Sequence, residues 1–384
     1  MVSILNSQSP VSSLQVSQVD LQAQHKECEA ELKTALDAVL RESAFVHGRF
    51  VREFEDAFAA YCETRFCLGV ANGTDALALA LRAAGVGQSD AVVTAPFTFA
   101  ATVEAIYHVG ARPVFVDIDP RMYTIDPAAL ETLLSRCGSV KAILPIHLFG
   151  QPANMDQIQN LAAQSGAVVV EDACQAHGAR WKGKRVGSFG ALACFSFYPT
   201  KNLGGIGDGG AIVTDDSKLA QLVRLLADHG QTRKYEHAFV GWNSRLDGVQ
   251  AAALTVKLKR LDEWNTRRRR WAAMYRQLLK DTSLLLPTED ADAFHAYHLF
   301  VIRTPRRDAL AEFLRQHGVS TALHYPQPLH LQPAFSHLGY RLGDFPSAEV
   351  CARECLSLPL HPHLTEEQVA WVCTCVQEWE KRKQ

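Results

Sequence analysis

The sequence lacks an excess of charge of either sign, a hydrophobic leader and any apolar run long enough to cross a bilayer. Its 39 Lys and Arg residues nearly balance 41 Asp and Glu residues, which leaves a net charge of −2. A near-neutral chain generates no overall field that would attract nucleic acid or an anionic membrane. The N-terminal stretch MVSILNSQSPVSSLQ has neither the basic nor the apolar region of a secretory signal. We therefore expect a cytoplasmic protein with no nucleic-acid and no membrane partner.

The chain contains 10 cysteines but not the ligand spacing of a zinc site. Cys373 and Cys375 form a CxC pair, and Cys351 and Cys355 stand one helical turn apart, but no second group of ligands accompanies them. In a long cytosolic chain such cysteines act as small buried apolar residues, so we expect no metal site. The arginine run at 267–270 lies in a helical segment with acidic residues nearby, which favours a solvated helix face or a subunit contact.

Strand-like and helix-like segments alternate through most of the chain. Apolar runs at 91–96, 141–149 and 167–173 each precede a more polar or amphipathic stretch, a pattern that predicts an α/β domain with a mostly parallel sheet. Further on, HLFVIRT and VSTALHY read as strands between helices. We predict a flexible N-terminus over 1–20, a large α/β domain over 21–255, and a linker helix with a smaller C-terminal α+β domain over 256–384.

Four segments place chemically useful side chains at predicted strand ends, where α/β sheets bind ligands. One strand ends in Asp172, whose carboxylate can pair with a cationic ring nitrogen. Lys201 precedes a run of glycines and, if partly desolvated, can act as an amine nucleophile. Gly73 and Thr74 open a helix whose first N–H groups can bind phosphate. Phe99 can stack on a flat heterocycle.

Each of these features alone also has an ordinary structural explanation. Asp172 can cap the next helix, Thr74 is a common N-cap residue type, Lys201 can be an exposed loop lysine, and Phe99 can pack in the core. Together they provide a phosphate cradle, an aromatic plate, a carboxylate for a ring nitrogen and a lysine amine. Pyridoxal 5′-phosphate (PLP) requires this set, so their joint occurrence at successive strand ends favours a PLP site.

The motifs that carry these residues resemble those of the DegT/StrS group of sugar aminotransferases. The likeness runs from Val19–Gln24 to Leu356–Thr365, nearly the whole chain. It rests on NGTDAL, FTFAAT, PIHLFGQPANMD, EDACQAHGA, FSFYPTKNLGGIGDGG, NSRLDGVQAAAL and HYPQPLH. The resemblance implies an α/β chain of PLP fold type I, with PLP and its amine form PMP as cofactor. It also implies a homodimer with shared active sites.

The resemblance further implies a role for each matching position. Lys201 matches the lysine that forms a Schiff base with PLP, and Asp172 matches the partner of the pyridine nitrogen. Gln175 matches the residue that hydrogen-bonds the ring hydroxyl, and Phe99 the stacking aromatic. Asn243 resembles a residue that reaches the phosphate of the neighbouring subunit's cofactor. The positions that match the phosphate binders within the subunit are Gly73, Thr74 and Ser196.

The implied reaction is a ping-pong transamination from an amino acid, L-glutamate in most of the family, to a nucleotide-linked keto-sugar. The segment 234–247 is most similar to members that aminate the sugar at C3. Tyr198, His324 and Tyr325 are candidates for contacts with the sugar or its diphosphate. The pair at 324–325 is equally suited to bracing the smaller domain.

Two alternative functions remain open, and a third conflicts with the sequence. The acceptor can be a keto-cyclitol instead of a sugar nucleotide, because the shared motifs do not separate the two. A non-catalytic PLP-binding regulator would need an added DNA-binding domain, for which the first ~40 residues are too short and too acidic. Related sugar dehydratases carry histidine where this chain has Lys201. We expect His147 and His177 to be structural, and we note Phe97 on the same segment as Phe99.

Overall fold

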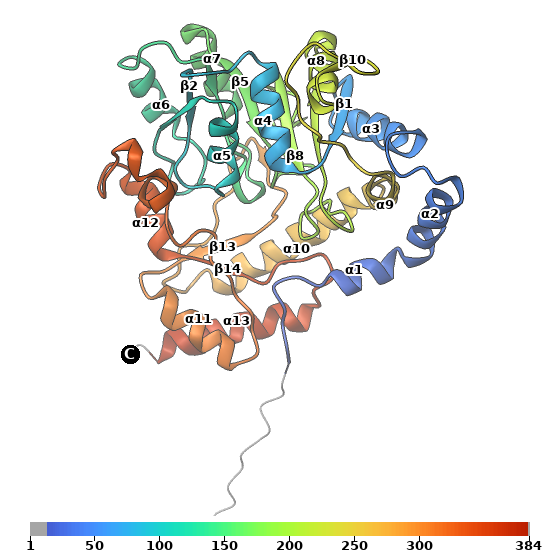
Figure 1. Cartoon of the computed structure of the whole chain (residues 1–384). Helices are drawn as coiled ribbons and strands as arrows, with labels where there is room; N and C mark the ends of the chain where they lie inside the picture. The colour runs from blue at the N-terminus through green and yellow to red at the C-terminus, as the bar shows by residue number, and fades with distance from the viewer. Residues whose placement is uncertain (1–13, 383–384) are drawn as a thin grey trace, which may run out of the picture.

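The computed structural model describes residues 14–382, and a seven-stranded sheet lies at its centre (Figure 1). All neighbouring strands are parallel except where β9 pairs with β1 and β8. This arrangement confirms the mostly parallel α/β sheet. In spatial order the strands are β1 (Phe66–Val70), β9 (Gly210–Thr214), β8 (Leu192–Ser196), β5 (Val168–Asp172), β4 (Ala142–Ile143), β2 (Ala91–Thr94) and β3 (Arg112–Phe115).

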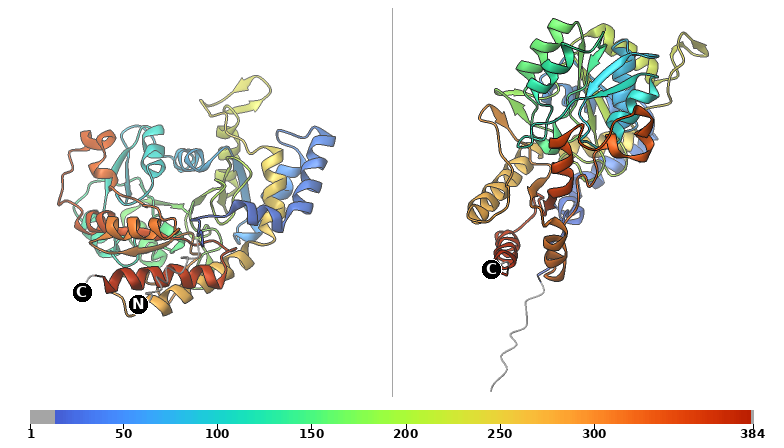
Figure 2. Two further views of the ribbon diagram at one scale, coloured as in Figure 1. Left: turned by 90° about the horizontal axis from the view of Figure 1, so that it is seen from below. Right: turned by 90° about the vertical axis from the view of Figure 1, so that its left-hand side faces the viewer.

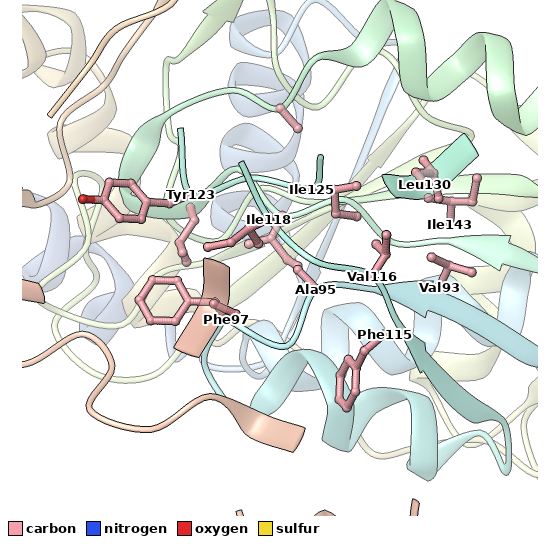
Figure 3. Packing of buried hydrophobic residues seen from close by; sticks show 14 of the residues in the cluster. Val93, Ala95, Phe97, Phe115, Val116, Ile118, Tyr123, Ile125, Leu130 and Ile143 are labelled. Carbon is pink, nitrogen blue, oxygen red and sulfur yellow. The ribbon is translucent and has the colours of Figure 1, made fainter. Parts of the chain in front are cut away.

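Helices cover both faces of the sheet, so most positions of its strands are apolar instead of alternating between apolar and polar. One face is covered by α4 (Gly73–Ala83), α5 (Ala101–His108) and α8 (Ser217–Ala227). The opposite face is covered by α3 (Arg49–Tyr61) and α9 (Gly248–Leu258). At the β3 side, α6 (Pro127–Leu134), α7 (Met155–Ser165) and α12 (Pro346–Glu354) pack into a third cluster, part of which is drawn in Figure 3.

Helix α4 shows how the local sequence directs residues to the edge of the sheet. Strand β1 ends at Val70, and Asn72 then caps the helix by accepting a hydrogen bond from the Asp75 backbone N–H at 2.8 Å. Alanine and leucine favour the helix and let it bury nearly all of its surface against β8 and β9. As a result, Gly73 and the first turn of α4 lie at the carboxyl end of the central strands.

A smaller antiparallel sheet forms the core of the C-terminal part (Figure 1). It consists of β13 (Phe300–Arg303) and β14 (Cys355–Leu358), packed against α10 (Leu261–Leu279), α11 (Arg307–Gln316) and α13 (Glu366–Lys381). The predicted strand HLFVIRT thus corresponds to β13, whereas VSTALHY forms only isolated bridges at Val319 and Ala322. The last two residues of this segment, His324 and Tyr325, line the cavity described below.

Two of the expected domain limits can be compared with the elements of the structure. The limit after residue 255 falls inside α9, which packs with the large sheet. Of the N-terminal stretch that we expected to be flexible, residues 1–13 lie outside the described residues. Its remaining part is held by Val16, which is buried and forms a parallel bridge with Val319. Between residues 14 and 382, no helix combines the length and apolarity needed to span a membrane.

The other elements are short or peripheral. The helices among them are α1 (Leu21–Glu27) and α2 (Glu29–Glu42), with 3-10 turns at Leu148–Gly150, Leu329–Leu331 and Pro333–Leu338. The strands among them are β6 (Arg180–Trp181), β7 (Lys184–Arg185), β10 (Gln231–Arg233), β11 (Glu236–His237) and β12 (Ala293–Phe294). Strands β10 and β11 form a hairpin that projects from the body of the molecule (Figure 2).

Candidate active site

A cavity of about 770 Å³ lies beside the carboxyl ends of the central strands. Its wall combines side chains from the sheet, from the first turn of α4 and from the C-terminal part. Ten of the eleven predicted site residues line it: Gly73, Thr74, Phe99, Asp172, Gln175, Ser196, Tyr198, Lys201, His324 and Tyr325. Asn243 is not among the residues that line it.

Asp172 stands at the end of β5 with its carboxylate fixed in place. Its Oδ2 accepts a hydrogen bond from the Thr102 hydroxyl at 2.8 Å, and its Oδ1 accepts one from the Cys174 backbone N–H at 3.2 Å. Thr102 is buried and lies 3.0 Å, oxygen to oxygen, from the Thr98 hydroxyl. Only 5% of Asp172 is exposed. Its carboxylate is therefore a well-oriented negative charge on the cavity wall.

The neighbouring carboxylate, Glu171, points away from the cavity and serves the fold. It accepts hydrogen bonds from His147 Nε2 at 3.0 Å and from the backbone N–H groups of Gly187, Phe189 and Gly190 at 2.7–2.8 Å. Burial alone would raise the pKa of Glu171, but these hydrogen bonds outweigh it and hold the pKa below its ordinary value. His147 is the partner of this buried ion, which agrees with the structural role predicted for it.

Lys201 lies in the loop between β8 and β9, where its backbone N–H donates to the Tyr198 carbonyl at 2.9 Å. Its amine faces the same cavity as Asp172. Burial lowers the pKa of Lys201 from its ordinary value because the cavity wall removes water from the ammonium ion. A larger share of the lysine is therefore neutral near pH 7 than of a solvated lysine, as a nucleophile requires.

Gly73 and Ser196 meet where α4 begins. A Cβ atom on Gly73 would lie 2.7 Å from Ser196 Cβ and 3.1 Å from Cys174 Sγ, so only glycine allows this approach. The backbone N–H groups of the first turn of a helix have no partner within the helix, and its dipole favours negative charge. With the Thr74 and Ser196 side chains beside them on the cavity wall, these groups form a cradle suited to a phosphate.

The structure separates the roles of the two phenylalanines in FTFAAT. Phe97 is buried in the core beside Tyr123 (Figure 3), with ring centroids 6.2 Å apart. Phe99 is 58% exposed on the cavity wall, tilted against the ring of Tyr325 at 6.0 Å. Gln175 holds that tyrosine: its Nε2 donates to the Tyr325 hydroxyl at 2.9 Å while its Oε1 accepts from a backbone N–H of the neighbouring loop. Phe99 is thus the aromatic available for stacking.

Two histidines from the C-terminal part face the cavity. His324 Nδ1 lies 2.8 Å from the Ser357 hydroxyl, and burial followed by the charge of Lys201 lowers the pKa of His324 to about 4. His298 Nδ1 lies 3.2 Å from the side-chain oxygen of Asn202, and burial holds the pKa of His298 well below its ordinary value. Both imidazoles are therefore neutral near pH 7.

Sequence reasoning missed several residues that this cavity uses. Thr102 and Thr98 were inside a recognised motif, but their link to Asp172 spans 70 positions and has no local signal. His298 comes from a segment with no recognised motif at all. His177, predicted to be structural, is fully buried between the rings of Phe195 and Phe197 and does not line the cavity.

The residues present fit PLP. A cradle with no room for a Cβ atom suits a phosphate, an exposed ring suits stacking, an oriented carboxylate suits a ring nitrogen, and a desolvated amine suits the aldehyde. No set of three or more His, Cys, Asp or Glu side chains forms a metal site within the described part of the chain. All ten cysteines are free thiols, and those of the CxC pair and at 351 and 355 are buried.

Comparison with known proteins points to one family. The profile of the DegT/DnrJ/EryC1/StrS aminotransferase family matches residues 26–377. The chain is 46% identical, over 95% of its length and 99% of the relative, to a "Pleiotropic regulatory protein" of Geobacillus stearothermophilus. It is 44% identical to a dTDP-3-amino-3,4,6-trideoxy-alpha-D-glucose transaminase of Streptomyces venezuelae, over 95% of this chain and 96% of the relative. It is 42% identical to a UDP-N-acetyl-3-dehydro-alpha-D-glucosamine 3-aminotransferase of Acidithiobacillus ferrooxidans, over 94% and 97%.

Solved structures agree with these relatives. DesV of S. venezuelae, crystallised with a ketimine intermediate, superposes with a TM-score of 0.93 at 44% identity, over 96% of this chain and 99% of that one. NtdA of Bacillus subtilis, with bound cofactor PMP, superposes with a TM-score of 0.88 at 29% identity, over 96% and 85%. Both similarities cover the sheet, the cavity and the C-terminal part together.

Proposed function

This chain belongs to the DegT/DnrJ/EryC1/StrS aminotransferase family, and from that membership we propose that it aminates C3 of a nucleotide-linked keto-sugar with PLP as cofactor. The observation that carries the proposal is the meeting of Lys201 and Asp172 in one cavity beside the Gly73–Ser196 cradle. Relatives that are 44% and 42% identical carry names that specify amination at C3 of a sugar linked to dTDP or UDP. The amino donor is L-glutamate.

PLP, when bound, supplies an aldehyde that takes up amines and a cationic ring that accepts electrons from them. Lys201 would hold that aldehyde covalently, since it is a lysine amine on the cavity wall with a lowered pKa. As a free amine on the cavity wall, the same side chain would accept and return a proton at its Nζ atom. The Lys201 Nζ atom is thus both nucleophile and proton carrier.

Asp172 would hold the ring nitrogen in its protonated form. Its two hydrogen bonds from Thr102 and Cys174 fix the carboxylate before any ligand binds, so little reorganisation is needed. Phe99 would cover one face of the ring, and Gln175 would approach the ring hydroxyl. These groups keep the cofactor in one orientation relative to Lys201.

The acceptor sugar would meet the wall formed by Tyr198, His324 and Tyr325. Neutral imidazole and phenol groups can donate and accept hydrogen bonds, as sugar hydroxyls require. Tyr198 is 54% exposed, so its hydroxyl is free to adapt to the ligand. The same wall would serve L-glutamate in the first half of the reaction.

The active protein would be a cytoplasmic homodimer with shared sites. The β10–β11 hairpin stands away from the body and exposes Tyr235 (82%) and, just after it, Val240 (93%), apolar surface that a second subunit can cover (Figure 2). Asn243 follows this hairpin and is exposed. It would reach the cofactor phosphate of the partner subunit. The division into a large domain and a smaller C-terminal domain likewise stays a prediction.

Two other functions are weighed against this one. A regulator is suggested by the name of the relative at 46% identity, whereas the relatives at 44% and 42% identity are named as sugar aminotransferases. A keto-cyclitol would fit the same cavity, and only the names of the relatives favour a nucleotide sugar.

The test incubates the holoprotein with L-glutamate and a panel of dTDP- and UDP-linked keto-sugars that differ in the position of the ketone. We expect a new amine, detected by mass, from the 3-keto members. A keto-cyclitol and a ketone at C4 serve as matched acceptors. A product from either of these alone would reject C3 amination, and no product from any acceptor, with PLP bound, would favour the regulator.

A further inference from the structure

Lys257 on helix α9 is completely buried, although lysine is ordinarily a surface residue. Its Nζ donates to the Gly204 carbonyl at 2.8 Å and to the Gly205 carbonyl at 3.3 Å, and lies 3.4 Å from His25 Nε2. Within residues 14–382, no carboxylate forms an ion pair with the ammonium group of Lys257. Because a buried charge is costly without compensation, its hydrogen bonds to the two carbonyls are the interactions that retain it there.

The two carbonyls belong to the loop that presents Lys201. The Gly205 N–H donates to the Phe197 carbonyl at 2.7 Å and thereby closes a loop with Lys201 at its middle. Gly204 packs so closely on Pro199 that a Cβ atom would lie 2.2 Å from the Pro199 carbonyl oxygen. The loop is therefore tightly folded. The Gly204 and Gly205 carbonyls, at its C-terminal end, point toward α9 and not toward the cavity.

A second side chain of α9 holds the next residue of the same loop. Gln250 lies two helical turns before Lys257, on the same face of the helix. Its Oε1 accepts a hydrogen bond from the Ile206 N–H at 2.8 Å. Helix α9 itself is fixed because Ala251, Ala252 and Leu254 are buried in the core cluster that it shares with α3 and the large sheet. The exit of the loop is thus attached to a rigid element at three successive residues.

We propose that Lys257 is a positioning residue for Lys201: it fixes the Gly204 and Gly205 carbonyls and so keeps the loop in the conformation that directs the Lys201 amine into the cavity. The inference rests on the proposed role of Lys201 as the lysine that holds the cofactor. Burial lowers the pKa of Lys257 to about 8, and its neutral form still has two N–H donors. Both forms can therefore serve the two carbonyls.

The test compares Lys257→Met with the matched control Lys259→Met in the PLP-loaded protein. Methionine keeps the length of the side chain but leaves both carbonyls without a donor, whereas Lys259 is exposed directly after the last residue of the same helix. We expect Lys257→Met to lower kcat of the half-reaction with L-glutamate by about tenfold, with little change in KM, because the amine is displaced from its working position. Hydrogen exchange of the backbone amides over residues 197–206 should become faster. The midpoint of the pH titration of the visible absorption band of bound PLP should shift.

A purely structural role of Lys257 predicts a different result in these measurements. If Lys257→Met lowers only the melting temperature and leaves kcat, the titration midpoint and hydrogen exchange at wild-type values, the proposal is overturned. Should that variant fail to fold, Lys257→Gln, which keeps an N–H donor, is compared with Lys259→Met instead. The same three quantities are measured: kcat, the titration midpoint and hydrogen exchange. A wild-type protein in which borohydride attaches no PLP to Lys201 overturns the proposed function and this inference with it. A normal wild type with an unchanged variant overturns this inference alone.

Discussion

The two walls of the cavity differ in how firmly their side chains are held. On the wall formed by the strand ends, Asp172 and Gln175 are buried and each makes two hydrogen bonds to the protein. Gly73 on this wall has no space for even one added carbon atom. On the wall assigned to the substrates, Tyr198 is 54% exposed. One wall is rigid before any ligand binds, and the other is open.

This difference matches the two kinds of ligand that an aminotransferase handles. The cofactor is the same in every turnover, so a wall fixed in advance lowers the cost of holding it in a reactive position. Donor and acceptor enter the same space in alternation, so their wall must suit two molecules. We therefore expect substitutions on the rigid wall to impair chemistry and cofactor binding, and substitutions on the open wall to change KM.

The largest effect is expected for Lys201→Ala. Removing the amine eliminates both the covalent attachment and the proton carrier, so kcat should fall by roughly 10⁴-fold. Borohydride treatment of the holoprotein should then attach no PLP to the chain, as measured by mass of the digested protein. Lys218→Ala, an exposed lysine on α8, is the control and should behave as wild type. A Lys201→Ala protein that turns over at the wild-type rate contradicts the whole assignment of the rigid wall.

Asp172→Asn should have the next largest effect, on catalysis and not on folding. Asparagine keeps the shape of the side chain but not the negative charge that would hold a proton on the ring nitrogen. A loss of about 10²-fold in kcat, with weaker retention of PLP, follows from removing one pre-oriented electrostatic group. Steady-state kinetics at saturating PLP measure the first effect and dialysis the second. An active Asp172→Asn enzyme would remove the proposed role of this carboxylate.

Glu171→Gln is the matched comparison, because the neighbouring carboxylate serves only the fold. Its loss should lower the free energy of unfolding by about 1–3 kcal/mol, measured with urea, and leave kcat near wild type. The pKa of Glu171 is depressed in the folded state, so its contribution is present above about pH 4.3, the value for an unfolded Glu, and is lost as the pH falls through the folded value. The variant and wild type should therefore converge in stability in acid.

The strand-end motifs could be read from the sequence because each is local. GTD after an apolar run, ED at a strand end and K before glycines can each be recognised within a few residues, and each contributes at least one residue to the same cavity. The alternating pattern likewise predicts the parallel sheet. By contrast, β9 runs antiparallel to both of its neighbours, and apolar runs buried on both faces carry no mark of direction.

The residues that support the site could not be predicted, because their contacts are distant in sequence. The bond from Thr102 to Asp172 and that from Lys257 to Gly204 each join elements more than 50 positions apart. A buried lysine on an Ala- and Leu-rich helix looks like an ordinary surface residue until the packing is known. Local chemistry therefore identified the groups that face the ligand, and only the fold identified those that hold them in place.

Gly73→Ala tests the rigidity of the cradle with a single added carbon atom. Because that carbon would lie 2.7 Å from Ser196 Cβ, the first turn of α4 or the end of β8 must shift. Overpacking of this kind costs about 1–3 kcal/mol, which corresponds to PLP binding weaker by roughly 5- to 160-fold. Gly138→Ala is the control, since no atom lies within 4 Å of the added carbon there. Equal PLP affinities of the two variants, from equilibrium titration of the apoproteins, would show that the cradle is not tight.

The smallest effect is expected on the open wall, for Tyr198→Phe. The side chain keeps its ring and loses one hydroxyl, worth about 0.5–1.5 kcal/mol if it bonds to the acceptor, so KM for the nucleotide keto-sugar should rise by a factor of about 2 to 10. KM for L-glutamate, measured separately in the first half-reaction, and PLP affinity should stay at wild-type values. A fall in kcat comparable to that of Asp172→Asn would place Tyr198 in the chemistry. The division between a rigid cofactor wall and an adaptable substrate wall would then be wrong at an exposed residue of the substrate wall.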